Sequence, residues 1–287
     1  MERIGDFTLT WGESLRWDDR RRRLYFVDCA TQSLYWLDRA EPPLQEMRLP
    51  SMPTGVVLTE GDSLVVCLDG GLHVVDPDNA SVEMLSPYPE GMHGRANDAN
   101  GDGAGNIITG TLNLGPGPGA LWQYSAADEW RRLDEPFGNT NGPVVIDVDG
   151  GRALVVGDTN AQAVYRYSYD SAAGQVAARE TLSDHGAISG GAPDGACADA
   201  DGGVWSCVLR SGKIARLDAG GLDRTVDVPM PNPSSVCFGG PDLRTAFVTS
   251  IALALGGETK EVGQESSWLV AMDIGATGRP EDRFCLA

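Results

Sequence analysis

The chain has 287 residues, and its 41 Asp and Glu outnumber its 22 Lys and Arg, which gives a formal net charge of −19 at pH 7. Nucleic acids and anionic membranes both bind clustered cations, so this charge excludes them as partners. The 37 glycines and 17 prolines favour many short strands joined by turns over long helices.

The N-terminal residues predict no export signal. Residues 1–6 lack the basic-then-apolar order of a signal peptide, and no apolar run approaches the ~18 residues of a membrane helix. We therefore expect a cytoplasmic protein. Its six cysteines form no CxxC pair, so we expect buried thiols rather than disulfides or metal ligands.

The first apolar segments of the chain set a pattern that later segments repeat. Each unit holds an apolar strand, a Gly/Asp turn, a second apolar strand, a polar spacer and a third strand that ends near Asp or Tyr. The first three units have strands expected at residues 13–17, 24–28 and 34–38, then 54–58, 63–67 and 72–76, then from 97 through 107–111 to 120–124. The last three begin at 141, 194 and 234, with middle strands at 153–158, 203–206 and 246–250 and third strands at 164–167, 213–218 and 268–273.

The opening positions of these units are spaced by 41, 43, 44, 53 and 40 residues. They are Glu13, Thr54, Asn97, Asn141, Asp194 and Ser234. Four-stranded propeller blades recur at roughly 40–50 residues. We therefore predict an all-β fold, a six-bladed β-propeller that occupies residues 1–287 as a single domain. Residues 7–10 are expected to add the outer strand of the last blade and close the ring. Two stacked β domains are the alternative, and the even period without a linker argues against them.

The opening residues of the blades are candidates for a metal site. The innermost strand of each propeller blade faces the central axis, so these residues converge. Glu13, Asn97, Asn141 and Asp194 carry carboxylate and amide oxygens, which are hard ligands suited to Ca²⁺, Mg²⁺ or Mn²⁺. The alternative is that Asn141-Gly142 and Asp194-Gly195 are simple hairpin turns.

Five motifs follow one another along nearly the whole chain. They are Trp11-Gly12-Glu13 before Trp17-Asp18, Arg95-Ala96-Asn97-Asp98 followed by Gly105-Asn106 and Gly110-Thr111-Leu112, Asn141-Gly142, Pro193-Asp194-Gly195 with Asp199, Gly202 and Trp205, and Pro233-Ser234-Ser235 followed by Gly239-Gly240 and Val248-Thr249-Ser250. In order and spacing they resemble the motifs of the gluconolactonase/regucalcin (senescence marker protein) family of metal-dependent lactonases.

The resemblance implies hydrolysis of a sugar-type lactone to its aldonate at one divalent cation, calcium foremost, with magnesium, manganese or zinc as alternatives. It implies that Glu13, Asn141 and Asp194 bind the cation and that Arg95 and Asn97 contact the substrate. Asp194 would also accept the proton of the attacking water. The expected partner is a small lactone, and the protein would be a monomer or a homodimer. Hydrolysis of phosphotriesters or other esters at the same site, or a non-catalytic calcium-binding scaffold, are the alternatives.

Some positions depart from the family pattern. Ser14-Leu15 stand where the family has Gly-Pro, and the loop 113–119 is short and lacks the acidic residue that some members use to bind substrate. His93, His185 and Arg210 are further polar residues that could reach the site, although loop and surface positions are the more common roles of such residues. The sequence does not identify the sugar.

Overall fold

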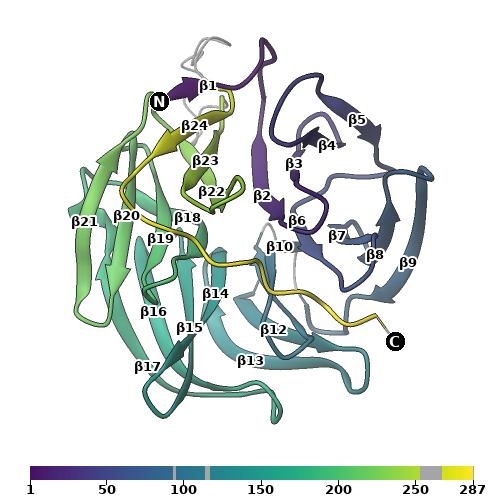
Figure 1. Cartoon of the computed structure of the whole chain (residues 1–287). Helices are drawn as coiled ribbons and strands as arrows, with labels where there is room; N and C mark the ends of the chain where they lie inside the picture. The colour runs from purple at the N-terminus through teal and green to yellow at the C-terminus, as the bar shows by residue number, and fades with distance from the viewer. Residues whose placement is uncertain (93–94, 114–116, 253–266, 287) are drawn as a thin grey trace.

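The computed structural model describes residues 1–92, 95–113, 117–252 and 267–286. In this part of the chain, 24 strands form six four-stranded antiparallel sheets, which are arranged as the blades of a propeller (Figure 1). The innermost strands of neighbouring blades contact one another around the ring. The prediction of an all-β, six-bladed propeller is confirmed.

The first three blades follow the chain from the inner to the outer strand. Blade one comprises β2 (Gly12–Asp18), β3 (Arg23–Asp28), β4 (Ser33–Asp38) and β5 (Gln45–Arg48). Blade two comprises β6 (Gly55–Leu58), β7 (Leu64–Leu68), β8 (Gly71–Asp76) and β9 (Ser81–Pro87). Blade three comprises β10 (Arg95–Gly101), β11 (Ile107–Leu112), β12 (Gly119–Ser125) and β13 (Glu129–Phe137).

The next two blades keep the same order, and the sixth draws on both ends of the chain. Blade four comprises β14 (Thr140–Val148), β15 (Gly151–Asp158), β16 (Ala163–Asp170) and β17 (Gln175–Asp184). Blade five comprises β18 (Ala192–Ala198), β19 (Val204–Leu209), β20 (Lys213–Asp218) and β21 (Gly221–Asp227). Blade six comprises β22 (Pro233–Gly239), β23 (Thr245–Ser250), β24 (Val270–Asp273) and β1 (Glu2–Arg3). The helical content of the described residues is one 3₁₀ turn, η1 (His185–Ala187), so none of them forms a helix that could cross a membrane.

The hydrophobic core lies between the blades. Alternate residues of each strand face opposite sides of its sheet, and here both sides pack on a neighbouring blade. One cluster joins Tyr25 and Val27 of blade one to Val56 and Leu64 of blade two, all of them buried. The inner strands β2, β18 and β22 are buried along their whole length. The inner strands are buried although they carry polar residues such as Glu13 and Asp194.

The ring closes with a strand that lies earlier in the chain than the sequence predicts. Glu2 pairs with Ala271 and Arg3 with Val270, so β1 and not residues 7–10 is the outer strand of blade six. Leu9 donates one backbone hydrogen bond to Ser267 O without forming a strand. The prediction that the N-terminal part of the chain closes the ring is confirmed. The prediction that residues 7–10 form the closing strand was wrong.

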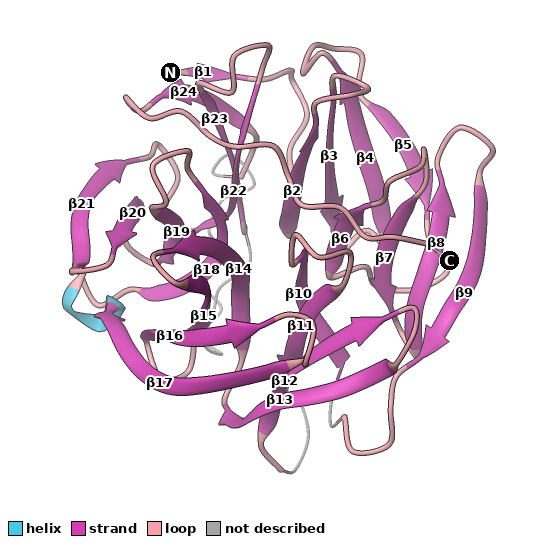
Figure 2. Ribbon diagram, turned by 60° about the horizontal axis from the view of Figure 1, so that its bottom comes forward, coloured by secondary structure: helices cyan, strands magenta, loops and turns pink. Residues whose placement is uncertain are grey.

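The C-terminal residues after β24 form what we call the C-terminal strap (residues 274–286). Figures 1 and 2 show it crossing one end of the ring from blade six towards blades two and three. Thr277 O accepts a hydrogen bond from Ala200, and Phe284 bridges to Thr59. Because these partners follow the ends of inner strands, the strap covers the end of the ring opposite to Glu13 and Asp194. We call these ends the strap face and the entrance face.

The cysteines mostly match their expected state. Cys29, Cys67, Cys197, Cys207 and Cys237 are buried free thiols, whereas Cys285 on the strap is exposed. The prediction of a buried thiol was therefore wrong at Cys285, because the strap lies on the outside of the ring. A small cavity lies under the strap, lined by residues 279–282 on one side and by Cys197 and Phe238 on the other.

Candidate active site

The four predicted oxygen ligands lie where their inner strands begin, at the entrance face. Glu13 lies on β2, Asn97 on β10, Asn141 on β14 and Asp194 on β18. Glu13, Asn141 and Asp194 are buried, and Asn97 is partly exposed. Neighbouring inner strands contact one another, so the fold gathers these side chains around one point near the axis.

A β-bulge accompanies each of these residues. The strand register shifts between Glu13 and Arg16, between Ala96 and Ala99, between Asn141 and Val144, and between Pro193 and Ala196. A bulge inserts an extra residue and redirects the side chains beside it, and bulges are common next to active sites. Of the two blades that supply no predicted ligand, blade two pairs β6 with β7 without a shift, whereas blade six has a shift between Pro233 and Ser235. The bulges therefore accompany the site residues but are not restricted to them.

Close approach between the blades requires glycine beside two of these residues. Gly142 has φ 51°, and a Cβ placed on it would lie 2.7 Å from the Cβ of Ala196. A Cβ on Gly195 would lie 2.7 Å from Ser234 O. Asn141-Gly142 and Asp194-Gly195 thus lie inside inner strands as bulges, and the alternative that they are only hairpin turns was wrong.

Hydrogen bonds fix the orientation of the two amides. Asn97 Nδ2 donates to Asn141 Oδ1 at 2.6 Å and to Thr140 O at 2.8 Å. Asn141 Nδ2 donates to Thr159 Oγ1, and that hydroxyl donates to Pro193 O at 2.9 Å. An amide oxygen has two lone pairs, so Asn141 Oδ1 keeps one for a ligand. The nitrogen of Asn97 makes both of its contacts, so its oxygen is available for a ligand as well.

Three carboxylates concentrate negative charge at this point. Burial raises the pKa of Glu13 well above its usual range, and the charges of Asp194 and Asp98 raise it further. Burial and the charge of Asp98 likewise raise the pKa of Asp194. These effects place Glu13, Asp98 and Asp194 within electrostatic reach of one another.

Asp98 is the carboxylate that the sequence reasoning did not assign to the site. It is buried, its Oδ2 accepts a hydrogen bond from Gly142 N at 2.9 Å, and burial raises its pKa. In a regular strand its side chain would face away from that of Asn97, but the bulge between Ala96 and Ala99 interrupts the alternation. Its place directly after Asn97 in a matched motif was the available signal.

The donor set fits a divalent cation. Glu13 Oε1 accepts from Trp11 Nε1 at 3.1 Å, but its buried Oε2 has no hydrogen-bond partner. A buried carboxylate oxygen without a partner is costly, and a bound cation would remove that cost. No three His, Cys, Asp or Glu side chains among the described residues form a group able to hold a metal alone, so a cation here would draw on further oxygen donors, for which the amides of Asn141 and Asn97 are candidates.

Arg95 begins β10 beside the second blade. Its Nη1 lies 3.5 Å from Asp69 Oδ1 and contacts Met52 Sδ. Asp69 lies in the turn between β7 and β8, and that turn ends at the entrance face. The guanidinium is thus held by an acidic neighbour at the rim of the site, which is compatible with the predicted contact to substrate and does not test it.

The other polar residues that could have reached the site, namely His93, His185 and Arg210, do not share one location. His185 is fully buried in η1, where its Nδ1 contacts Ser183 Oγ at 3.2 Å, so it does not line an open site. Arg210 is exposed at the entrance face and acts electrostatically on Asp194. His93 and positions 114–116 of the short loop lie outside the described residues.

Serine and threonine at the other opening positions link the blades. Thr54 Oγ1 donates to Ala96 O at 2.7 Å, which joins blades two and three. Ser234 Oγ donates to Gly12 O and Ser235 Oγ accepts from Leu15 N, which joins blades six and one. Ser14, which replaces the usual glycine, has φ 53° and accepts from Val56 N at 2.7 Å. The ring of opening residues thus divides into structural links and site groups.

Comparison with known proteins shows that this chain is similar to proteins named as lactonases. Residues 11–252 match the family described as the SMP-30/gluconolactonase/LRE-like region. The chain is 31% identical to pentonolactonase XacC of Haloferax volcanii, over 99% of this chain and 97% of that protein. It is 32% identical to 6-deoxy-6-sulfogluconolactonase of Pseudomonas putida, over 83% and 82%.

Solved structures show the same architecture. A luciferin-regenerating enzyme superposes with a TM-score of 0.88 and 23% identity, over 97% of this chain and 96% of that chain. A calcium-binding protein, regucalcin from Agrobacterium tumefaciens, superposes with a TM-score of 0.88 and 21% identity, over 100% and 98%. At these identities the two structures support the fold alone.

Proposed function

This chain belongs to the SMP-30/gluconolactonase/LRE-like family, and we propose that it opens a small sugar-type lactone to its hydroxy acid with the help of one divalent cation. The observation that carries this proposal is the convergence of Glu13, Asp194 and Asn141 at the entrance face, with Glu13 Oε2 buried and unpartnered. The lactonase names of the relatives from Haloferax volcanii and Pseudomonas putida support it.

Glu13, Asn141 and Asp194 would hold the cation through two carboxylates and one amide oxygen. Calcium is the foremost candidate because all three donors are oxygens, and magnesium, manganese and zinc are the alternatives. The regucalcin from Agrobacterium tumefaciens is described as a calcium-binding protein, which supports this choice. A divalent cation in such a site supplies Lewis acidity towards the lactone carbonyl.

The side chains would divide the remaining chemistry. Water adds to the carbonyl carbon, the bond from that carbon to the ring oxygen breaks, and a proton passes from the water to the departing oxygen. Asp194 would take that proton and return it, since burial and the charge of Asp98 raise the pKa of its carboxyl and make it a stronger base. Arg95 and the Asn97 oxygen would bind the hydroxyls of the sugar and orient the ring.

Replacing the proposed base tests this mechanism. We expect Asp194→Asn to lower kcat/KM on lactones by about 10²–10⁴-fold, since it removes both a cation ligand and a general base. Acid release from a panel of lactones, measured with each metal after EDTA treatment, reports turnover, and calorimetry reports cation affinity. The matched control is Asp149→Asn, because Asp149 is exposed in the turn between β14 and β15, away from the entrance face.

The same panel separates the alternatives. Full lactonase activity and cation affinity in Asp194→Asn would refute the assignment. Cation binding without turnover of any lactone or ester would identify a calcium-binding scaffold. Turnover of phosphotriesters or other esters but not of lactones would keep the site and change the substrate.

A further inference from the structure

A second arginine, Arg210, lies at the entrance face on blade five, two blades after Arg95. Arg210 directly follows β19, whose last residue Leu209 pairs with Ala192, two residues before Asp194. Its backbone N–H donates to Asn232 Oδ1 at 3.2 Å, which ties the turn to the sixth blade. The backbone at Arg210 and the register of β19 therefore hold this side chain at the rim of the site.

The turn carries Arg210 in a conformation that disfavours side chains. Its φ is 65°, in the left-handed region that favours glycine, and Gly212, two residues later, has the same φ. Eleven other non-glycine residues of the described chain share this conformation, so it fixes the backbone of the turn and does not by itself assign a role to the side chain.

The charge of Arg210 is not matched by a carboxylate in the described part of the chain. Its side chain is exposed and makes no ion pair or side-chain hydrogen bond with a described residue. Arg95, in contrast, already has Asp69 at 3.5 Å. The strand register places Arg210 beside the site, because Leu209 before it pairs with Ala192 and Val208 pairs with Pro193, the residue before Asp194.

A cation-binding site alone gains nothing from such a residue. An arginine beside the carboxylates repels a divalent cation bound by them and weakens its binding. An anionic group on the substrate would make the arginine favourable for binding, because a guanidinium donates paired hydrogen bonds to carboxylate, sulfonate or phosphate oxygens. The protein carries a net charge of −19, so a substrate anion needs a local cation of this kind to approach.

We propose that Arg210 binds an acidic substituent of the substrate, and that the natural substrate is a sugar lactone with a second, negatively charged group away from its ring carbonyl. This inference rests on the lactonase function proposed above and narrows it to one class of lactones. Carboxylate, sulfonate and phosphate share the chemistry that a guanidinium recognises.

A matched series of lactones tests the inference. δ-Gluconolactone is compared with its counterparts that carry a carboxylate, a sulfonate or a phosphate at carbon 6. We expect the wild-type enzyme to prefer at least one charged member. Arg210→Gln should raise KM for that member by about 10- to 100-fold and leave KM for the neutral lactone within about twofold, since charged hydrogen bonds are the stronger ones.

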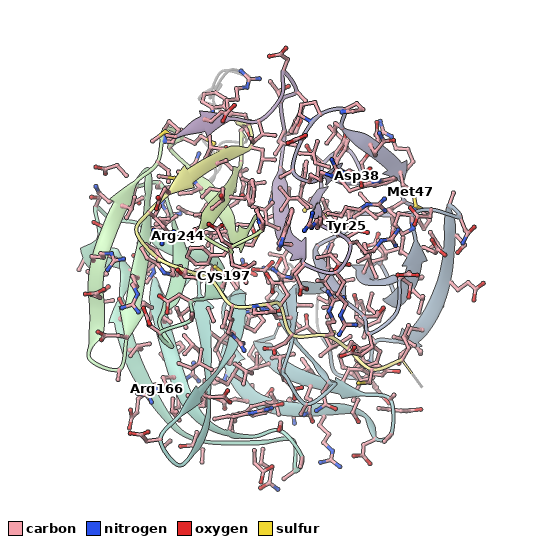
Figure 3. The ribbon with its side chains drawn as sticks, in the orientation of Figure 1. Tyr25, Asp38, Met47, Arg166, Cys197 and Arg244 are labelled. Carbon is pink, nitrogen blue, oxygen red and sulfur yellow. The ribbon has the colours of Figure 1, made fainter. Side chains whose placement is uncertain are left out.

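Two further variants separate binding from structure. Arg210→Lys keeps the charge without the planar fork, so it should recover part of the loss. Arg244→Gln is the matched control, because Arg244 (Figure 3) is exposed between β22 and β23, at the strap face, and should change no KM. The melting temperature of each variant shows whether the turn still folds.

The outcomes distinguish this inference from the proposed function. An equal effect of Arg210→Gln on neutral and charged lactones, or no preference of the wild type for any charged member, would overturn the inference and leave the lactonase intact. No turnover of any lactone by the wild type would overturn both. The charged member whose KM changes identifies the acidic group.

Discussion

The buried Asp98 has a different role from the residues that would bind the cation. Its charge raises the pKa of both Glu13 and Asp194, so it adds to the negative potential at the entrance face. It accepts from Gly142 N, and an asparagine oxygen could accept the same hydrogen bond. Substitution by asparagine therefore removes a charge while keeping the local geometry.

We expect Asp98→Asn to weaken cation binding by about 10- to 100-fold, because one of three interacting negative charges is lost. In the presence of EDTA the same variant should melt about 2–4 °C higher than the wild type, since the raised pKa shows that the fold disfavours this charge. Calorimetry and thermal melts measure the two effects. Asp149→Asn, at an exposed turn, should change neither. An unchanged cation affinity in Asp98→Asn would contradict the role of its charge.

His185 should make the protein sensitive to mild acid. Burial lowers its pKa to about 4, so the folded protein keeps this ring neutral where the unfolded chain, with a pKa of about 6.5, takes up a proton. The stability that depends on the neutral ring is complete above pH 6.5 and is lost as the pH falls towards 4. Between pH 7 and 5 this amounts to about 2 kcal/mol.

Substitution of His185 by leucine and by glutamine tests this linkage. Both variants remove the titrating group. Between pH 7 and 5, the decrease in the free energy of unfolding should therefore be about 2 kcal/mol smaller in each variant than in the wild type. Urea denaturation at a series of pH values measures it. The two variants will differ in stability at pH 7 because they pack differently. Their pH dependence should agree, and a slope equal to that of the wild type in both would refute the linkage.

At the scale of elements, apolar patterns located most of the strands. The two middle strands of each blade lie close to the predicted residues, because both faces of a blade are buried and their apolar residues are easily recognised. For the inner strands of blades three to six only the opening residue was predicted, and each of these residues lies within the first three residues of its strand. No strand was predicted after the third strand of each unit, where β5, β9, β13, β17 and β21 lie, because these outer strands are mostly exposed and have no apolar signal. Both residues of the closing strand β1 are exposed, so this strand was not predicted for the same reason.

Two features of the site could not be predicted from the sequence, namely the β-bulges and the place of Asp98. A repeat with a period of two shows which strand is buried but not where an extra residue enters it. Asn97 and Asp98 are neighbours in the chain, so strict alternation assigns only one of them to the axis. Glu13, Asn141 and Asp194 could be found because they open their blades, and their proposed roles stay predictions.

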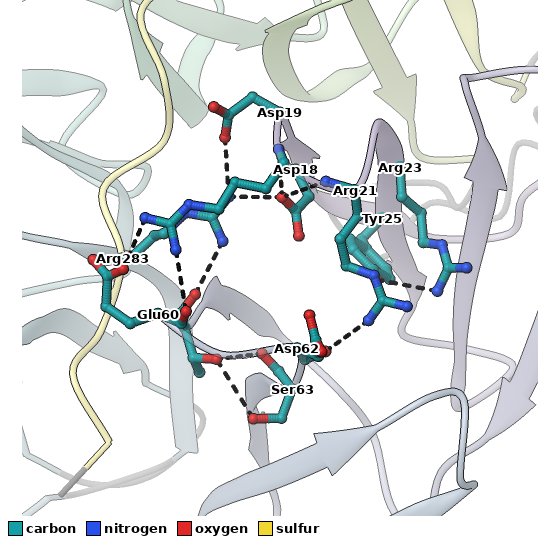
Figure 4. Close-up of polar contacts among 11 residues, drawn as sticks. Asp18, Asp19, Arg21, Arg23, Tyr25, Glu60, Asp62, Ser63 and Arg283 are labelled. Carbon is teal, nitrogen blue, oxygen red and sulfur yellow. Dashed lines mark hydrogen bonds and ion pairs between the residues drawn. The ribbon is translucent and has the colours of Figure 1, made fainter.

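The C-terminal strap is attached by a buried ion pair (Figure 4). Arg283 Nη2 lies 2.6 Å from Asp18 Oδ1 and 2.9 Å from Asp19 Oδ1, and its Nη1 donates to Thr59 O at 3.0 Å. The side chains of Arg283 and Asp18 are only 5% and 4% exposed. No local pattern predicts a contact between residues so far apart in the chain.

We expect Arg283→Met to lower the free energy of unfolding by about 3 kcal/mol, because it leaves the carboxylate of Asp18 buried without its partner. Urea denaturation followed by circular dichroism measures it. The matched control is Arg20→Met, which breaks an ion pair with Glu60 whose side chains are 51% and 52% exposed. An exposed pair contributes at most about 1 kcal/mol. Equal effects of the two substitutions would show that the strap does not depend on the buried pair.

At the scale of the whole molecule, the six blades close through the N-terminus, and the C-terminal strap joins blades six, five, two and three at one face. The N-terminal strand thus completes the fourth strand of blade six, and each blade keeps only a short outer edge. A closed ring cannot expand locally to separate its charges, so the net charge of −19 acts on the fold as a whole.

Repulsion within so acidic a ring should make its stability depend on salt. The screening length is about 10 Å at 0.1 M salt and about 3 Å at 1 M, so salt removes repulsion between distant carboxylates before it weakens buried pairs such as Arg283 with Asp18. In EDTA, we expect the melting temperature to rise by about 5 °C between 0.05 and 1 M potassium chloride. Chloride is preferred to sulfate, because sulfate also strengthens apolar burial.

Neutralising exposed acids should reproduce part of the effect of salt. Glu83, Glu90 and Glu180 are exposed and have no ion pair among the described residues, so their joint replacement by glutamine removes repulsion without breaking a contact. This variant should melt higher than the wild type at 0.05 M salt and gain less from 1 M. A melting temperature that falls with salt in both proteins would mean that ion pairs between the blades outweigh the repulsion, since screening weakens attraction and repulsion alike.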